Sequence, residues 1–197
     1  MTLSSAETSL AQLDPIIGEL IAQHGHIAMR PQREYFEALA SAIVGQQISV
    51  KAAAKIFERF RDTTQLDPLK TSLLTDEQIK TIGLSGQKSR YIRDLAAHFV
   101  DDSAVFNHLD SLSDDEVIAE LTRVKGIGVW TAQMFLIFTL HRPDVFAPDD
   151  RGLQLAVEKL YDRTFTRSEL EALAEGWSPY RSMACLHLWR SLDNEPV

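Results

Sequence analysis

The sequence predicts an all-α protein, and three observations lead to that class. Seven segments repeat apolar residues at helical spacing, three capping boxes mark helix starts, and no run of four to eight residues alternates as a strand would. Short gaps containing Gly and Pro separate these segments, as is usual between packed helices. The helical segments are residues 15–23, 34–44, 50–60, 88–99, 129–140, 153–161 and 180–192.

Each capping box is a hydroxyl residue followed three positions later by a carboxyl or amide, which closes the first helical turn from both sides. The three boxes are Thr75 with Gln78, Ser113 with Glu116, and Thr166 with Glu169. Segment 129–140 is apolar on every side of the helix it predicts. We therefore expect that helix to be packed all round and central.

Length and composition suit one globular domain, or two lobes that share a core: 197 residues, 45% hydrophobic and 24% charged. A single cysteine, Cys185, excludes an internal disulfide, a thiolate zinc site and an iron–sulfur cluster, and predicts a reducing compartment. The longest apolar run, 134–138, is five residues, and the first residues show neither the basic flank nor the apolar core expected of a signal peptide. We expect no membrane association.

The formal net charge of −8 argues against a protein that binds polyanions through its charge. The segment Val124-Lys125-Gly126-Ile127-Gly128 offers another route, because it predicts a tight glycine turn that leads directly into a helix. Amides at a helix start lack internal acceptors and lie at the positive end of the helix dipole, so the turn predicts a phosphate site. The alternative is an ordinary turn between two helices.

Asp150 follows in a loop, and its carboxylate has two interpretations. It caps a helix that begins near Leu153, as Asp149 also could. Alternatively, it lies beside the bound phosphate, which is electrostatically unfavourable unless a cation develops there.

Five stretches together resemble the DNA glycosylase superfamily with its helix-hairpin-helix and Gly/Pro-Asp signature, and within it the DNA-3-methyladenine glycosylase II branch. VKGIGVWTA at 124–132 and DVFAPDD at 144–150 match that signature. Segments 36–56, 82–96 and 177–189 agree in order and spacing, so the resemblance covers 31–192.

The resemblance implies two helical lobes with an active-site cleft between them. One lobe is a helical barrel at 36–142 that contains the hairpin, and the other is formed by 1–35 and 143–197. It also implies a monofunctional DNA glycosylase of base excision repair, a hydrolase of the N-glycosidic bond. Such an enzyme flips cationic alkylated purines, such as 3-methyladenine and 7-methylguanine, out of duplex DNA and removes them. We expect damaged double-stranded DNA as the partner and a cytoplasmic monomer, at the nucleoid in a bacterium or in the nucleus of a eukaryote.

By position, the resemblance makes Asp150 the catalytic carboxylate. Trp130 occupies the place of the Schiff-base lysine of strand-cutting relatives, so no strand break is expected. No metal or cofactor is implied, apart from a structural Na⁺ or K⁺ at the hairpin carbonyls. The implied substrate-pocket residues are Trp130, Trp189 and Met134, and the implied DNA contacts are Gln47, Lys51, Lys88, Arg90, Lys125, Gly126 and Gly128.

Plainer interpretations stay open for several of these residues. The tryptophans suit core packing, the lysines a solvated face, and Gln47 a helix end before the cap Ser49. Met134 stands where some relatives have tyrosine, which leaves the substrate range open. Tyr180 and Arg181 match a C-terminal motif that supports the pocket helix. Two other functions also remain: a noncatalytic helix-hairpin-helix DNA-binding protein, and a glycosylase for oxidised or mismatched bases.

Overall fold

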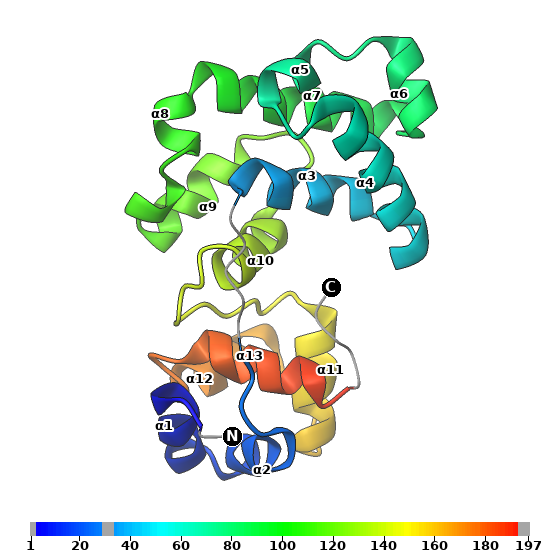
Figure 1. Ribbon diagram of the computed structural model, residues 1–197. Helices are drawn as coiled ribbons and strands as arrows, with labels where there is room; N and C mark the ends of the chain where they lie inside the picture. Colours follow the sequence, from blue (N-terminus) through cyan, green and yellow to red (C-terminus); the bar gives the residue numbers. More distant parts are fainter. Residues whose placement is uncertain (1–2, 29–33, 193–197) are drawn as a thin grey trace. The chain divides into compact units, whose positions relative to one another are not determined.

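The computed structural model describes residues 3–28 and 34–192, and within those ranges every regular element is a helix (Figure 1). The outer ends of the expected lobes, and the start of the resemblance at 31–33, lie outside the described residues. The elements are α1 Ser5–Leu13, α2 Pro15–His24, α3 Tyr35–Gly45, α4 Val50–Thr64, α5 Pro68–Ser72, α6 Asp76–Ile82, α7 Gly86–Asp101, α8 Ser103–Phe106, η1 Leu109–Ser111, α9 Asp114–Thr122, α10 Val129–Phe138, α11 Arg151–Leu160, α12 Arg167–Glu175 and α13 Arg181–Arg190.

The predicted helix starts are confirmed where local chemistry fixes them. All three capping boxes form with both hydrogen bonds, at the starts of α6, α9 and α12. A fourth box, Ser4 with Glu7, begins α1 and was not predicted, although its residues fit the same pattern. The short helices α5 and α8 were also missed, because five and four residues are too few to show a helical period.

The chain divides into two compact units. Unit 1 consists of Met1–Arg30 and Leu136–Val197, and unit 2 is Pro31–Phe135. The division falls inside α10 rather than at residue 142. The end of α10 belongs to unit 1 because its Phe138 ring packs against Trp189 of α13, with ring centroids 5.5 Å apart.

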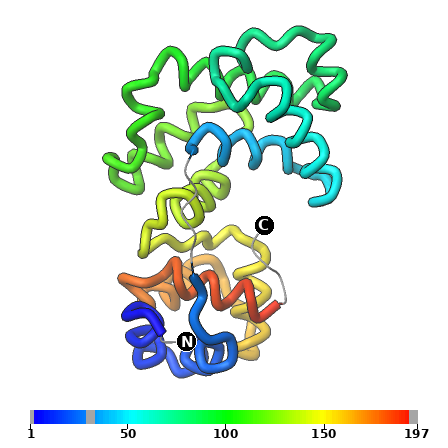
Figure 2. Tube along the Cα trace, viewed as in Figure 1, coloured from blue at the N-terminus to red at the C-terminus, as the bar shows by residue number. Residues whose placement is uncertain are grey.

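Unit 1 joins both ends of the chain. In it α13 packs against α2 and α11, and α1 packs against α2, so helices from the two ends of the sequence lie side by side (Figure 2). Fully buried aliphatic side chains from the N-terminal and C-terminal helices fill this core, among them Leu10, Ile17, Leu153, Val157 and Leu188. This packing fixes α11 and α13, the helices next to Asp150.

Unit 2 is organised around α7. The helices α3 and α5 pack against α7, and α4 packs against α3 and α6. Its core side chains with no exposed surface include Ile43, Phe60, Ile92, Leu95 and Phe106. The glycine turn at 124–128 and the loop between α3 and α4 both belong to this unit.

Candidate functional site

The glycine turn joins α9 to α10 as the sequence predicted, and its two glycines meet different demands. Gly126 has φ +86°, and a Cβ added there would lie 2.2 Å from Cδ2 of Tyr91. Gly126 is therefore required by the backbone conformation and by the ring beneath it. At Gly128 φ is not positive, and an added Cβ would meet nothing within 4 Å. The missing side chain at Gly128 leaves room for a molecule to approach the backbone.

The glycine turn leads directly into the start of α10, and a phosphate site at a helix N-terminus requires this arrangement. The amide of Ala132 donates to the carbonyl of Gly128 at 3.0 Å, so the helical pattern begins at that residue. The first amides of an α-helix generally have no acceptor within the helix, and the helix dipole is positive at that end. An anion such as a phosphodiester suits this position.

The expectation that α10 is packed all round is wrong at its first turn. Val129 is 50% exposed and Trp130 is 48% exposed, whereas Phe135, Leu136 and Ile137 are buried. Met134 is partly exposed. An apolar composition does not distinguish a core helix from one that offers apolar side chains to a ligand. The exposed indole of Trp130 is more typical of the second case.

Lys125 is paired within unit 2. Its ammonium lies 2.8 Å from Oδ1 of Asp94, and its backbone amide donates to Oδ2 of the same residue at 2.8 Å. Burial raises the pKa of Asp94, but the hydrogen bonds from Lys125 outweigh it and hold that pKa below its ordinary value. Lys125 thus anchors the turn to α7, and its side chain remains largely exposed.

Gln47 lies at the exposed tip of the loop between α3 and α4. Its φ is +57°, a left-handed conformation that costs a non-glycine residue about 1–2 kcal/mol. Such strain often occurs at binding loops. Ser49 caps α4 by accepting from the amide of Ala52, so the plainer interpretation of this segment is confirmed for Ser49. The neighbouring Ile48 is also exposed.

The basic side chains on α4 and α7 that were expected to contact DNA fall into two groups. Lys51 is exposed in the first turn of α4, and Arg90 is exposed at the start of the second turn of α7. Lys88 instead donates from Nζ to the carbonyl of Val44 at 2.6 Å, close to the end of α3. Burial lowers the pKa of Lys88. Lys88 therefore holds the end of α3 in place.

Asp150 is 9% exposed and caps α11. Its Oδ1 accepts from the amide of Leu153 at 2.8 Å, which confirms the capping interpretation. The same oxygen accepts from Nε1 of Trp189 at 2.9 Å. A cap and an indole donor thus fix the orientation of this carboxylate.

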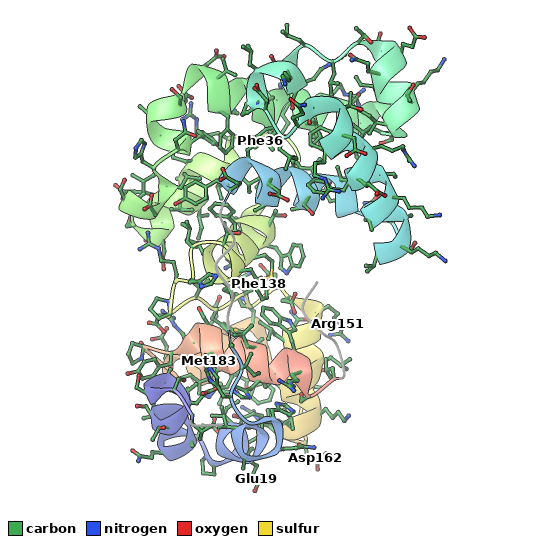
Figure 3. All side chains as sticks on the ribbon, in the orientation of Figure 1. Glu19, Phe36, Phe138, Arg151, Asp162 and Met183 are labelled. Atoms are coloured by element: carbon green, nitrogen blue, oxygen red, sulfur yellow. The ribbon has the colours of Figure 1, made fainter. Side chains whose placement is uncertain are left out.

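Trp189, expected to line a substrate pocket, is only 7% exposed. Its indole lies between Phe138, which Figure 3 labels, and Gly152. A Cβ added to Gly152 would lie 3.1 Å from Oδ1 of Asp150 and 3.2 Å from Cδ1 of Trp189. In this structure Trp189 positions Asp150, and Gly152 provides the space in which they meet. This role was missed because 39 residues separate the two partners.

The loop that leads to Asp150 is fastened to the start of α13. Asp144 accepts from Nε of Arg181 at 2.8 Å and from Oγ of Ser178 at 2.8 Å. Burial raises the pKa of Asp144, but hydrogen bonds from Arg181 and Ser178 hold it below its usual range. The hydroxyl of Ser182 donates to the carbonyl of Arg142 at 2.6 Å and accepts from the amide of Val145 at 3.0 Å. The supporting role expected of Arg181 agrees with these contacts.

Metal-binding side chains do not gather anywhere in the described part of the chain, where no group of three His, Cys, Asp or Glu residues is placed to hold an ion. The hairpin offers backbone oxygens instead. The carbonyl of Val124 accepts from Ile127, and that of Gly126 accepts from Gln46. A carbonyl oxygen has two lone pairs, so these groups have the chemistry to bind Na⁺ or K⁺ as well.

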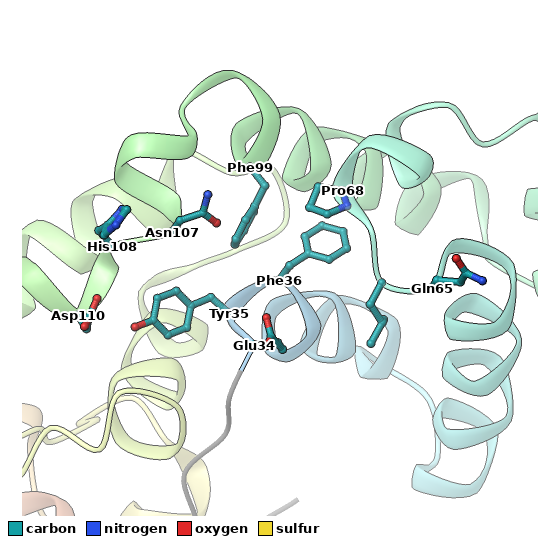
Figure 4. Close-up of a pocket in the computed structure, with 10 residues that line it drawn as sticks. Glu34, Tyr35, Phe36, Gln65, Pro68, Phe99, Asn107, His108 and Asp110 are labelled. Atoms are coloured by element: carbon teal, nitrogen blue, oxygen red, sulfur yellow. The ribbon is translucent and has the colours of Figure 1, made fainter.

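A cavity of about 570 Å³ lies elsewhere in unit 2 (Figure 4). Its lining includes Phe36 and Glu34 at the start of α3 and Gln65 and Pro68 after α4. These are the ends of α3 and α4 remote from the Gln47 loop. None of the predicted site residues lines this cavity, so its size does not identify the functional site.

None of the helices in residues 3–28 and 34–192 has the length and apolar character needed to cross a membrane.

The all-helical fold and the glycine hairpin define a helix-hairpin-helix protein. A solved DNA-3-methyladenine glycosidase from Bacillus halodurans has the same fold, with a TM-score of 0.87 and 32% identity over 95% of this chain and 89% of that one. A 3-methyladenine DNA glycosylase (Mag1) from Schizosaccharomyces pombe, solved in complex with abasic DNA, gives a TM-score of 0.81 at 29% identity, over 96% and 97% of the two chains.

The chain belongs to the HhH-GPD superfamily of base excision DNA repair proteins, whose family model matches residues 40–180. The DNA-3-methyladenine glycosylase of Saccharomyces cerevisiae is 36% identical over 80% of this chain. This chain spans 66% of the length of that protein and 66% of a Bacillus subtilis relative. The predicted family and fold class are confirmed.

Proposed function

We propose that this protein is a monofunctional DNA glycosylase that removes cationic alkylated purines, such as 3-methyladenine and 7-methylguanine, from duplex DNA during base excision repair. Relatives from two yeasts that are 30% and 36% identical have the name DNA-3-methyladenine glycosylase. The observation that carries the proposal is Asp150, a nearly buried carboxylate whose orientation is fixed by a helix cap and an indole.

In this proposal Asp150 acts on the sugar. When the N-glycosidic bond breaks, its electron pair leaves with the base and the sugar becomes positively charged. A fixed carboxylate in a dry setting stabilises that charge without having to reorganise. Water then adds to the sugar and loses a proton, and the same carboxylate orients that water. The hydrolysis leaves an abasic site.

Trp130 suits the recognition of the base. Its indole is half exposed at the start of α10, and the face of an indole attracts a cation by about 0.5–2 kcal/mol. Alkylation at N3 of adenine or N7 of guanine makes the base cationic and a better leaving group. An aromatic face therefore selects such bases without many hydrogen bonds, and the partly exposed Met134 lies one helical turn further on. Trp189 would contribute through its bond to Asp150.

The hairpin and the Gln47 loop would bind DNA without a net positive charge on the protein. The amides of Gly126, Gly128 and the first turn of α10 would bind a phosphate, and carbonyls of Val124 and Gly126 would hold a Na⁺ or K⁺ ion, which supplies further positive charge for the phosphate. Gln47 would fill the gap left by the flipped nucleotide. Lys51 and Arg90, with Lys125, would contact the DNA backbone.

Trp130 also determines the expected product. A tryptophan has no amine to form a Schiff base with the sugar, so the strand stays intact. We further propose that the protein acts as a monomer wherever the DNA is held, at a nucleoid or in a nucleus.

The test compares Asp150→Asn with Asp149→Asn, a neighbour that pairs with Arg167 on the surface. Asparagine retains one carbonyl oxygen for Leu153 and Trp189 but loses the negative charge. We expect release of 7-methylguanine from methylated duplex to fall at least 100-fold in Asp150→Asn. Asp149→Asn should stay within twofold of the unmodified protein, and both variants should still bind abasic-site DNA.

Four results would each contradict a part of the proposal. If Asp150→Asn releases bases as fast as the unmodified protein, Asp150 is not the catalytic group. If the unmodified protein binds abasic-site DNA but releases no base, it is a noncatalytic DNA-binding protein. Release of an oxidised or mismatched base, with no release of a methylated one, would change the substrate class. Strand cleavage without alkali, or a borohydride-trapped adduct, would contradict monofunctional action.

A further inference from the structure

One side-chain hydrogen bond joins the two proposed DNA-contacting features of unit 2. Nε2 of Gln46 donates to the carbonyl of Gly126 at 2.8 Å. Gln46 directly precedes the exposed Gln47, and Gly126 lies in the glycine turn. The partners are 80 residues apart, so this bond closes a long loop of the chain.

Both features are also fastened to one face of α7. Lys88, Tyr91 and Asp94 are spaced three residues apart and therefore share a side of that helix. Lys88 holds the carbonyl of Val44 just before the Gln47 loop, and Asp94 holds Lys125 in the turn. The ring of Tyr91 lies under Gly126. The helix α7 thus supports both features, and Gln46 connects them directly.

The bridge adjoins the strained residue. Gln46 is the C-cap of α3, and Gln47 follows with φ +57°. A left-handed non-glycine residue persists only where its surroundings hold it. The backbone amide of Gln46 donates to the carbonyl of Ile43, and its side-chain amide donates to the carbonyl of Gly126. These two bonds restrict the backbone of the adjacent Gln47.

We propose that Gln46 is a positioning residue, which keeps the Gln47 loop in register with the glycine turn so that both engage DNA as one preformed unit. This inference rests on the proposed function of the two features. A preformed unit loses less conformational freedom on binding than a loop that must order itself against the turn. The advantage applies to duplex DNA, where a flipped nucleotide leaves a gap to be filled, and not to a single strand.

The experiment uses Gln46→Glu, which keeps the shape but removes the donor, and Gln46→Ala. Single-turnover release of 7-methylguanine from duplex should fall about tenfold in both variants, whereas release from a single strand should stay within twofold. Gln87→Ala is the matched control, because it also removes a side-chain amide donor from unit 2, the one to the Tyr91 hydroxyl, and leaves the bond between Gln46 and Gly126 in place. Gln87→Ala should match the unmodified protein on both substrates.

A second measurement needs no catalysis. Hydrogen exchange of the DNA-free protein should quicken in segments 44–50 and 124–128 in both Gln46 variants, and not in Gln87→Ala. Unchanged exchange in those segments would overturn the bridge. Faster exchange with no loss of excision, or with equal loss on duplex and single strands, would overturn the positioning role. If the unmodified protein released no base, the proposed function would fail, while exchange and affinity for abasic duplex would still decide the role of Gln46.

Discussion

Unit 1 contains two aspartates with similar surroundings, which differ in the carboxylate oxygen that accepts the hydrogen bond from the indole. Asp14 and Asp150 are both buried, both cap a helix, and both accept from a tryptophan indole. At Asp14 the cap amides of Ile16 and Ile17 bind Oδ1, while Trp177 and the hydroxyl of Tyr161 bind Oδ2. At Asp150 the amide of Leu153 and the indole of Trp189 both bind Oδ1.

The two aspartates differ in how the helix cap and the indole share the carboxylate. At Asp14 the donors are divided between the two oxygens, so both oxygens stabilise the fold. Burial and then the bond to Asp14 raise the pKa of Tyr161 above its usual range, so Tyr161 remains a donor even in mildly alkaline solution. At Asp150 the cap and the indole converge on one oxygen, Oδ1.

The largest expected effect on stability comes from Asp14→Asn. Asparagine has one acceptor oxygen, so its amide nitrogen would face donors on one side and leave them unsatisfied. We expect a loss of about 3 kcal/mol in the free energy of unfolding. Asp150→Asn keeps an acceptor for the Leu153 amide and the Trp189 indole, so its loss should be smaller. Urea unfolding of the two variants measures the contrast, and equal losses would show that the two sites are alike.

A third buried carboxylate, Glu7, adds a prediction about how the stability of unit 1 changes in acid. Burial raises the pKa of Glu7, but hydrogen bonds from the amides of Ile27 and Ser4 and from the ring of His26 outweigh it and hold the pKa at about 2. Burial lowers the pKa of His187 to about 4. Glu7 opposes that shift from 3.4 Å, while the neighbouring His24 and Arg190 add to it.

Both shifts predict that acid weakens unit 1. Between pH 6.5 and 4 the unfolded chain protonates His187 while the folded protein resists, so stability falls as the pH falls. Between about 4.5 and 2 the unfolded chain protonates Glu7, and stability falls further. Each step is worth up to about 3 kcal/mol.

Urea midpoints measured across pH check this expectation. The slope between pH 6.5 and 4 should flatten in His187→Gln and persist in His108→Gln, an exposed histidine of unit 2. An unchanged slope in His187→Gln would assign the acid sensitivity to other groups.

The smallest expected effect separates the two indoles. Trp189→Phe removes the donor to Asp150 and keeps an aromatic ring, so we expect kcat for excision to fall about tenfold. Trp177→Phe removes the matching donor to Asp14 and should lower stability by about 1–2 kcal/mol with kcat unchanged. Excision rates and thermal unfolding of both variants give the comparison. A normal kcat in Trp189→Phe would remove the positioning role of that indole.

Local chemistry made much of the fold predictable from sequence. The capping boxes, the apolar spacing and the capping role of Asp150 all depend on neighbours within about four residues. The glycine turn was found in the same way, because its two glycines and the following helix are contiguous.

Contacts between distant residues were not predictable in this way. The bonds from Trp189 to Asp150 and from Gln46 to Gly126 join residues 39 and 80 positions apart, and no periodicity encodes such pairs. Glu7 makes one contact that its local sequence indicates and several that it does not. Its capping box with Ser4 follows a recognisable pattern, whereas its contacts with His26, Ile27 and His187 depend on the packing of three helices.

The unequal exposure of the three tryptophans gives the protein a built-in optical reporter. Trp177 and Trp189 are 1% and 7% exposed, whereas Trp130 is 48% exposed. Indole emission shifts to longer wavelength in water, so the red edge of the fluorescence spectrum reports mainly on Trp130. Stacking of a nucleobase on that ring quenches its emission. A titration with unlabelled oligonucleotide would therefore follow the proposed contact between a base and Trp130 without any dye.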